Sequence, residues 1–199
     1  LKELEKAEKF IFLEYFIISE GYAWDKILKI LEKKASEGIE VRVLYDGMGT
    51  LFTLTDGYER ILAGKGIKAK VFMPVTPLLS TIQNNRDHRK IAVIDGHIGY
   101  VGGFNIGNEY LGKVKRFGYW RDTHARFEGD IVDKLQLSFM MDWNFCFESK
   151  FYVDDYYYPT KRVVNYYPEQ IVSAGPTQKS PNIRNSNFKL INEAEHTIY

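Results

Sequence analysis

Apolar runs alternate with amphipathic stretches along the first half of the chain. Residues 10–18 form a nearly continuous apolar run, which is typical of a strand buried on both faces. Residues 23–36 have the periodicity of a helix that packs on one side, and this stretch stops before Gly38. The same reasoning gives, in order, a helix at 1–9, a strand at 10–18, a helix at 23–36, a strand at 41–44, a helix at 56–64 and a strand at 69–72.

This alternation of strands and helices predicts an α/β fold, with a mixed, largely parallel sheet and helices on both faces. Two further β-type runs flank Asp95-Gly96, a dipeptide that is the strongest short signal for a hairpin turn. A strand at 122–128 and a long helix at 131–147 follow. These elements account for one domain with a hydrophobic core of its own.

The last fifty residues have a different composition. Residues 149–181 are rich in Tyr, Pro, Ser and Asn, which indicates a connecting segment. Residues 188–199 repeat the pattern of residues 1–12, and Lys2, Ala7, Glu8 and Ile11 recur at the same offsets. Chance is the alternative, because charged amphipathic helices look alike. We predict a first domain at 1–148, a connecting segment at 149–185 and the start of a second, similar half at 186–199, so that the chain is an excerpt.

Charge and composition narrow the classes of function. The chain has 27 Lys and Arg residues against 26 Asp and Glu residues, so it lacks the basic excess with which a protein grips nucleic acid nonspecifically. No apolar run reaches the ~18 residues that a membrane-spanning helix requires. The single cysteine, Cys146, has no partner for an internal disulfide and lies among aromatic residues, where a buried thiol is expected.

Three polar residues gather on the predicted hairpin. If the turn is centred on the Asp-Gly dipeptide, His88 faces Gly103 and Lys90 faces Val101 across the ladder. Because side chains alternate along a strand, His88, Lys90 and Asn105 then project from one face. The glycine opposite His88 leaves space for a substrate group, so the sequence predicts a pocket here.

This set of side chains suits a phosphodiester. A neutral imidazole can attack phosphorus, while a lysine and an asparagine amide stabilise the charge on the non-bridging oxygens. The chemistry requires no metal and no other cofactor. Asp95 lies at the turn, about seven residues and so ~20 Å from His88. We therefore interpret Asp95 as a structural residue that holds the hairpin.

The motif H-x-K-x4-D followed by G-G-x-N resembles the phospholipase D superfamily. The surrounding segments narrow the resemblance to bacterial cardiolipin synthases, and these segments are Tyr45-Asp46-Gly47, residues 85–90, 93–96, 102–112 and 119–124. The resemblance implies two similar halves that share one site, with one histidine as nucleophile and the other as general acid. Residues 1–148 would be the N-terminal catalytic half.

What the resemblance implies for single residues follows the motif. His88 matches the nucleophile, Lys90 and Asn105 match the phosphate-binding positions, and Asp122 is the candidate for a carboxylate that orients the His88 imidazole. Gly102 and Gly103 are structural parts of the motif, and Gly103 replaces the serine of much of the superfamily. Glu109 is expected at a helix start after the glycine turn, with a role near the site as the alternative.

The implied reaction transfers a phosphatidyl group between two phosphatidylglycerol molecules, giving cardiolipin and glycerol through a phosphohistidine. The expected partners are phosphatidylglycerol, a membrane surface, and a second phospholipase D-like half or a homodimer mate, but no nucleic acid. The expected location is the bacterial cell membrane on its cytoplasmic side, with an anchor outside these residues. The alternatives are a nuclease of the same superfamily, which would need a basic groove, and a noncatalytic scaffold, which would be expected to lack His88 or Lys90.

Overall fold

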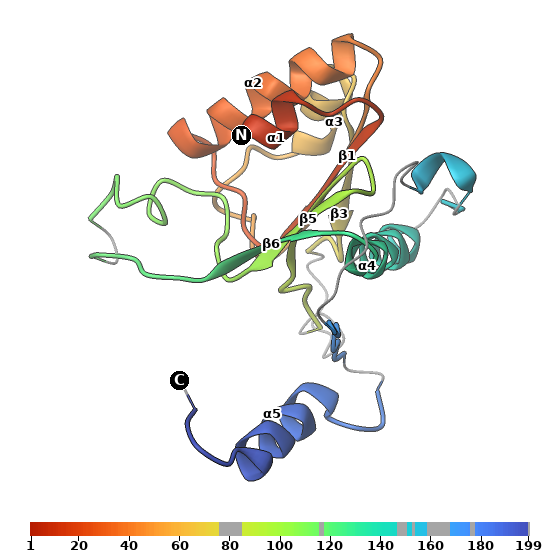
Figure 1. Ribbon diagram of the computed structural model, residues 1–199. Coiled ribbons are helices and arrows are strands. Elements are labelled where there is room, and N and C mark those ends of the chain that lie inside the picture. Colours follow the sequence, from red (N-terminus) through yellow and green to blue (C-terminus); the bar gives the residue numbers. More distant parts are fainter. Residues whose placement is uncertain are drawn as a thin grey trace. The chain divides into compact units, whose positions relative to one another are not determined.

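A six-stranded sheet forms the centre of the first part of the chain (Figure 1). The computed structural model describes residues 1–75, 85–115, 118–146, 151–152, 154–158, 168–175 and 178–198. The chain divides into two compact units, Leu1–Tyr166 and Tyr167–Tyr199. The elements of the first unit are α1 (Lys2–Glu5), β1 (Phe10–Tyr15), α2 (Tyr22–Ser36), β2 (Glu40–Asp46), α3 (Tyr58–Ala63), β3 (Lys68–Phe72), β4 (Lys90–Ile94), β5 (Ile98–Gly102), β6 (His124–Glu128), α4 (Ile131–Phe145) and the short 3₁₀ helix η2 (Asp155–Tyr157).

The strand order is β3-β2-β1-β4-β5-β6. β1, β2 and β3 pair in parallel, as expected for strands that are joined by the helices α2 and α3. β4 pairs antiparallel with β1, and the β4–β5 and β5–β6 pairs are also antiparallel. The predicted α/β class with a mixed sheet is therefore confirmed. The expectation of a largely parallel sheet is wrong, since three of the five strand pairings are antiparallel and the described residues between β4, β5 and β6 contain no crossover helix.

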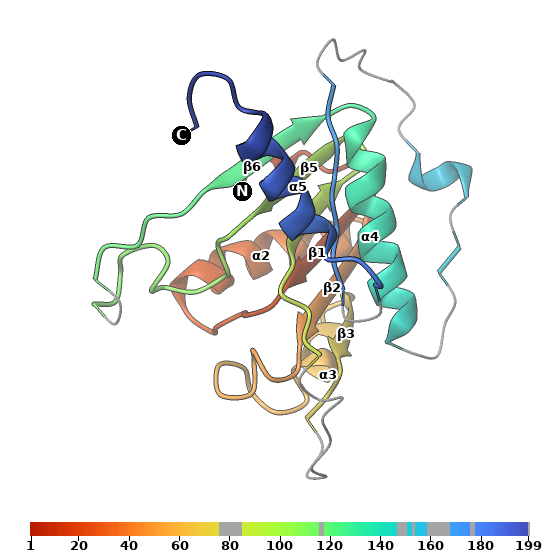
Figure 2. The same ribbon diagram turned by 90° about the horizontal axis from the view of Figure 1, so that it is seen from below.

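Helices cover both faces of the sheet, as predicted. α1, α2 and α3 lie on one face and α4 lies on the other (Figures 1 and 2). On the α2 face, Trp24 and Leu31 are fully buried over the strands, and the Trp24 indole donates a hydrogen bond of 2.7 Å to the Tyr58 hydroxyl. On the α4 face, the Phe12 ring stacks on Phe139 at 4.7 Å between centroids. Both faces of β1 are thus buried, which explains its continuous apolar run.

The β4–β5 hairpin has the predicted turn but a different register. Asp95 and Gly96 both have positive φ, and the His97 amide donates to the Ile94 carbonyl, as in a tight two-residue turn. His97 is then an extra residue, because Ile94 pairs with Ile98 and Ile91 pairs with Val101. The predicted pairing of Lys90 with Val101 is therefore wrong by one residue.

Packing against α4 explains the observed register. Gly99 faces this helix, and a methyl group on Gly99 would lie 2.7 Å from Leu135 Cδ1. A shift of one residue would turn every β5 side chain to the other face and place a large side chain where only glycine fits. Close approach of the helix thus selects the register that the turn alone does not fix.

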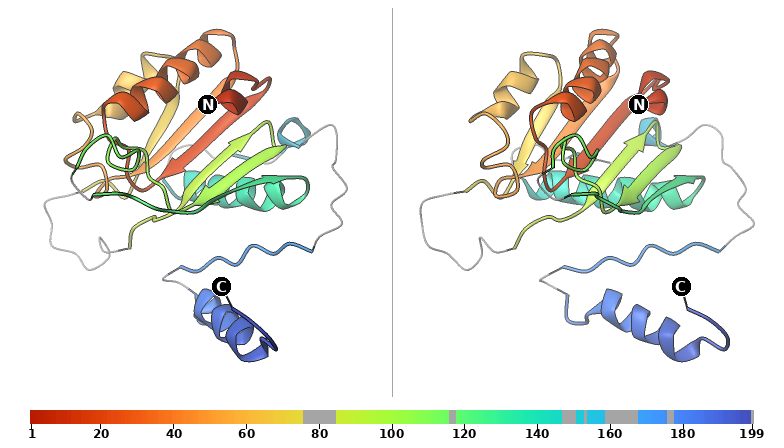
Figure 3. Two further views of the ribbon diagram at one scale, coloured as in Figure 1. Left: turned by 60° about the vertical axis from the view of Figure 1, so that its left-hand side comes forward. Right: turned by 90° about the vertical axis from the view of Figure 1, so that its left-hand side faces the viewer.

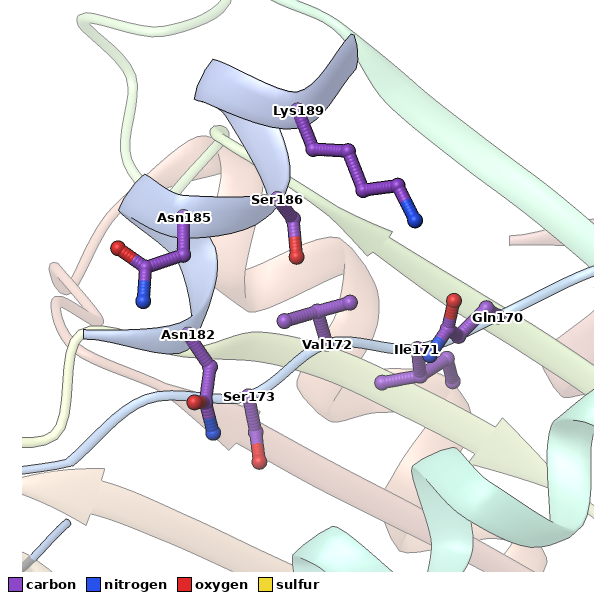
Figure 4. Close-up of a pocket in the computed structure, with 8 residues that line it drawn as sticks. All are labelled: Gln170, Ile171, Val172, Ser173, Asn182, Asn185, Ser186 and Lys189. Carbon is purple, nitrogen blue, oxygen red and sulfur yellow. The ribbon is translucent and has the colours of Figure 1, made fainter. Parts of the chain in front are cut away.

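The second unit contains α5 (Asn182–Glu193), which has no buried residues. A hollow between α5 and the extended segment that precedes it is lined mostly by polar side chains (Figure 4); the lining residues are Gln170, Ile171, Val172, Ser173, Asn182, Asn185, Ser186 and Lys189. α5 overlaps the segment that we expect to begin a second half, and that expectation remains a prediction. Among the described helices, none is both long and apolar enough to cross a membrane.

Candidate active site

The His88 imidazole lies flat on the ring of Phe16, with 3.8 Å between centroids and 19° between planes. His88 stands just before β4, and Phe16 is the first residue after β1. Phe16 is in turn confined by Gly49, since a methyl group on this glycine would lie 2.1 Å from the Phe16 carbonyl oxygen. The end of β1 therefore fixes the plane of the imidazole. The apolar pattern placed Phe16 inside a longer strand, so this role of Phe16 was not predicted from the residues.

Lys90 opens β4 on the α2 face, paired with Tyr15, and is 8% exposed. Its ammonium group donates to the His88 carbonyl oxygen and lies 5.4 Å from the centre of the Phe16 ring. Burial lowers the Lys90 pKa, while the charges of Asp87 and Asp122 oppose this change. His88 and Lys90 thus both lie against the Phe16 ring, and the buried Lys90 ammonium has little contact with water.

Asn105 joins the loops that follow β1 and β5. Its Oδ1 accepts a hydrogen bond of 2.9 Å from the Ile17 amide, and its Nδ2 donates to the Tyr110 hydroxyl at 3.3 Å. Because β5 ends at Gly102, strand alternation does not place Asn105. The loop brings Asn105 to Ile17, the residue next to Phe16, so His88, Lys90 and Asn105 gather at the end of β1.

Asp122 is linked to Asn105 through two aromatic residues. Asp122 Oδ2 accepts from the Trp120 indole at 3.1 Å, and Oδ1 accepts from the Thr123 amide at 2.7 Å. The Trp120 ring packs edge-on against Tyr110, which contacts the Asn105 amide. No hydrogen bond joins Asp122 to His88 in the described part of the chain. The negative charge of Asp122 instead acts on Lys90 and His124, raising the pKa of each against the larger effect of burial.

Gly102 and Gly103 make room for the chain that leads into β6. A methyl group on Gly102 would lie 2.4 Å from the Thr123 carbonyl oxygen, and one on Gly103 would lie 2.0 Å from Asp122 Oδ1. The Asp122 carboxylate therefore occupies the space beside Gly103 that the sequence assigned to a substrate group. That expectation is wrong, because glycine is needed here for the protein's own carboxylate.

We expect Gly103→Ala to lower the free energy of unfolding by about 1–3 kcal/mol, because the added methyl group must displace Asp122. Urea denaturation checks this result, with Gly64→Ala as the control, since a methyl group there would meet the Ile61 and Arg60 carbonyl oxygens no closer than 3.4 Å. Adding Asp122→Ala to Gly103→Ala should recover part of the loss. If Gly103→Ala and Gly64→Ala have the same stability, the contact between the added methyl group and Asp122 has no energetic cost.

Asp46 holds the segment that carries His88. It ends β2, is 1% exposed, and accepts from the Met48 and Gly49 amides through Oδ1 and from the Asp87 amide through Oδ2 at 3.1 Å. Burial raises the Asp46 pKa, and the hydrogen bonds and Arg86 oppose this change. Asp46 is a positioning residue that sequence reasoning did not assign to the site. Its signals were its position at the end of a buried strand and its place in the Tyr45-Asp46-Gly47 segment.

A cluster of three carboxylates lies on the α4 face of the sheet, and one of them belongs to Asp87, the residue before His88. Glu14, Asp87 and Asp142 each offer an oxygen within 4.8 Å of the others, and oxygen ligands of this kind suit hard cations. Arg89 supplies positive charge, with its guanidinium 2.5 Å from Asp142 and 3.5 Å from Asp87. Glu14 is fully buried, and among the described residues none donates a hydrogen bond to either of its oxygens. Burial, and then Asp87, raise the Glu14 pKa well above its ordinary value.

Two other acidic residues singled out in the sequence are Asp95 and Glu109. Asp95 accepts hydrogen bonds from the Glu8, Lys9 and Phe10 amides at 2.7–2.9 Å, at the far end of β4 from His88. Glu109 lies in a turn rather than at a helix start, so that expectation is wrong. Its carboxylate folds over Gly107, where a methyl group would lie 2.7 Å from Oε2.

The mixed six-stranded sheet, with a histidine-lysine motif at the start of its central antiparallel strand, defines a phospholipase D-like domain. A family model described as "Cardiolipin synthase, PLD-like domain" matches residues 1–143, and the chain belongs to this family. The chain is 41% identical over 202 residues to a cardiolipin synthase of Listeria innocua and 44% identical over 201 residues to one of Staphylococcus aureus. All of the chain is matched, but it spans only 42% and 40% of those proteins.

A solved structure supports the fold. The phosphatidylserine synthase of Haemophilus influenzae matches 71% of this chain and 33% of its own, with a TM-score of 0.55 and 19% sequence identity. Similarity at this level of identity concerns the arrangement of strands and helices alone.

Proposed function

We propose that this chain supplies one half of the site of a cardiolipin synthase. The observation that carries the proposal is the His88 imidazole held on Phe16 beside the buried Lys90 ammonium. An imidazole nitrogen attacks the phosphorus of one phosphatidylglycerol, and the bond from phosphorus to the head-group glycerol oxygen breaks. Glycerol leaves with a proton, and the phosphatidyl group stays on His88.

In the second step, the terminal hydroxyl of another phosphatidylglycerol attacks this phosphohistidine. The bond from phosphorus to nitrogen breaks, the hydroxyl proton passes to a base, and cardiolipin leaves. Lys90 and the Asn105 amide stabilise negative charge on the non-bridging oxygens in both transition states. The charges of Asp87 and Asp122 raise the Lys90 pKa against the larger effect of burial. Asp122 is also the candidate carboxylate to orient His88 when substrate is bound.

The leaving glycerol requires a general acid, which contributes typically ~10²–10⁴-fold to the rate. The chain carries a single H-x-K motif, so we place this acid on a second phospholipase D-like half, in the same protein or in a homodimer mate. Phosphatidylglycerol at a membrane surface is the proposed substrate, and the bacterial cell membrane, on its cytoplasmic side, is the proposed location.

The test is a product assay on full-length protein that carries both halves. Phosphatidylglycerol in mixed micelles should give cardiolipin and free glycerol in equal amounts, and the 199-residue chain alone should give neither. Phosphatidic acid in place of cardiolipin would indicate a hydrolase. If no lipid product forms, cleavage of single-stranded DNA would favour a nuclease, and its absence would favour a scaffold. Robust turnover by the strictly monomeric chain would contradict the half-site proposal.

A further inference from the structure

Two loops at the end of the sheet that carries His88 have exposed apolar side chains. The most exposed are Phe52, at 93%, and Tyr119, at 91%. Both are aromatic, and both extend from loops rather than from a helix or strand. Four neighbours along the chain are between 44% and 56% exposed, and together the six residues form what we name the apolar rim: Met48, Leu51, Phe52, Leu111, Val114 and Tyr119.

The topology places the rim at the end of the sheet that carries His88. β1 and β2 are parallel and end there, β4 begins there, and β5 returns there. The loops that follow β1, β2 and β5 therefore leave the sheet at one end (Figure 3). Met48, Leu51 and Phe52 come from the loop after β2, and the other three come from the loop after β5.

Hydrogen bonds tie these loops to one another through the loop after β1. The Thr53 hydroxyl donates to the Ile18 carbonyl at 2.7 Å, and the Ser19 amide donates to the Ile106 carbonyl at 2.8 Å. On the outer side, the Lys113 ammonium lies 4.2 Å from the centre of the Tyr22 ring. The described parts of the rim thus belong to one connected layer that also contains Asn105, which bonds to Ile17.

The charge pattern of the last loop indicates what the rim meets. Residues 111–121 read Leu-Gly-Lys-Val-Lys-Arg-Phe-Gly-Tyr-Trp-Arg, with basic residues between apolar ones and no acidic residue. Lys113, Lys115 and Arg121 are exposed. Aromatic and aliphatic side chains that enter the headgroup region, flanked by Lys and Arg, bind anionic lipid surfaces. A protein partner would need a pocket for each projecting ring, whereas a bilayer accommodates such rings without shape complementarity.

We propose that the apolar rim docks the domain on a bilayer of anionic phospholipid. This inference rests on the proposed function and deepens it, because it names the surface by which His88 reaches phosphate groups at headgroup depth. Phe52 and Tyr119 enter the bilayer from two loops, and Lys113, Lys115 and Arg121 remain at the level of the lipid phosphates. The substrate then moves laterally into the site without leaving the membrane.

The test measures binding without turnover. The 199-residue chain is floated with vesicles of phosphatidylglycerol and phosphatidylcholine, and with vesicles of phosphatidylcholine alone. We expect the chain to float with the anionic vesicles, and each of Phe52→Ser and Tyr119→Ser to weaken partitioning about tenfold. Lys113→Gln with Lys115→Gln should weaken partitioning only on anionic vesicles. The difference from the wild type should become smaller at high salt.

The matched control is Met141→Ser with Tyr152→Ser, which removes side chains that are 64% and 69% exposed but lie outside the three loops. Phe52→Ser, Tyr119→Ser and the control should keep the wild-type unfolding midpoint, since these side chains are 64–93% exposed. Unchanged flotation of Phe52→Ser with Tyr119→Ser would overturn the proposal, as would a wild-type chain that does not bind anionic vesicles.

Light scattering that shows a dimer lost in the rim variants would assign the rim to a protein contact instead. A chain that docks normally while the full-length protein makes no cardiolipin would contradict the proposed function and leave the docking surface intact.

Discussion

Replacing His88 by alanine in the full-length protein should lower cardiolipin formation by about 10⁴-fold or more, the range found when a nucleophile is removed from a concerted site. The physical reason is that Lys90 and Asn105 can still bind the phosphate, but no atom remains to take the phosphatidyl group. KM for phosphatidylglycerol should change little, while kcat falls. Thin-layer separation of labelled lipids measures the loss directly.

His97→Ala is the matched control, because His97 lies at the turn at the other end of the same hairpin strand. It should keep near wild-type rates. Acid-labile, alkali-stable label from phosphatidylglycerol should appear on wild-type protein and be absent from His88→Ala. A His88→Ala variant that keeps a tenth of the wild-type rate would remove this residue from the nucleophile's role.

Arg89→Met should destabilise the fold by about 3 kcal/mol at pH 8, since it leaves the Glu14, Asp87 and Asp142 carboxylates without their cation. The figure is at the lower end for a broken buried pair because the Arg89 side chain is 33% exposed. Urea denaturation at several pH values measures the change. The β4 strand starts beside this cluster, so lost order there should also displace His88.

The loss should depend on pH in a definite direction. The pKa values of Glu14 and Asp142 are raised by burial, so the folded state holds protons more tightly than the unfolded state, in which these groups titrate near pH 4. Stability therefore falls as the pH rises from that value through the raised pKa values. The Arg89→Met defect should be smaller at pH 5 than at pH 8, and Glu14→Gln should reduce it at pH 8. A defect independent of pH, unaffected by Glu14→Gln, would assign Arg89 a packing role alone.

The order of the elements was predictable because each apolar run is long and has turn residues at its ends. His88 and Lys90 both lie against the Phe16 ring, but His88 precedes β4, so strand alternation does not account for its position. The pairing itself was missed, because the fit of Gly99 beneath α4 is a tertiary contact that no local pattern encodes. Phe16 beneath the imidazole was missed for the same reason, as an aromatic residue in a buried run is most often part of the core.

The contacts of Asp122 also could not be predicted from the sequence. Its indole partner is two residues away, but the carboxylate's place beside Gly103 depends on how β5 and β6 align. Asn105 was assigned to the correct neighbourhood for an incorrect reason: strand alternation stops at Gly102, and a loop makes the contact with Ile17.

Asp95 illustrates how a genetic screen could misread this domain. Its three hydrogen bonds fasten the hairpin turn to the start of β1, and Phe16, at the other end of β1, supports the imidazole. The six residues of β1 thus transmit the position of the turn to the site. A substitution of Asp95 that loosens this fastening would be scored as an inactive mutant, although Asp95 lies at the far end of β4 from His88. Scoring folded protein and turnover side by side separates an anchor of this kind from a reacting group.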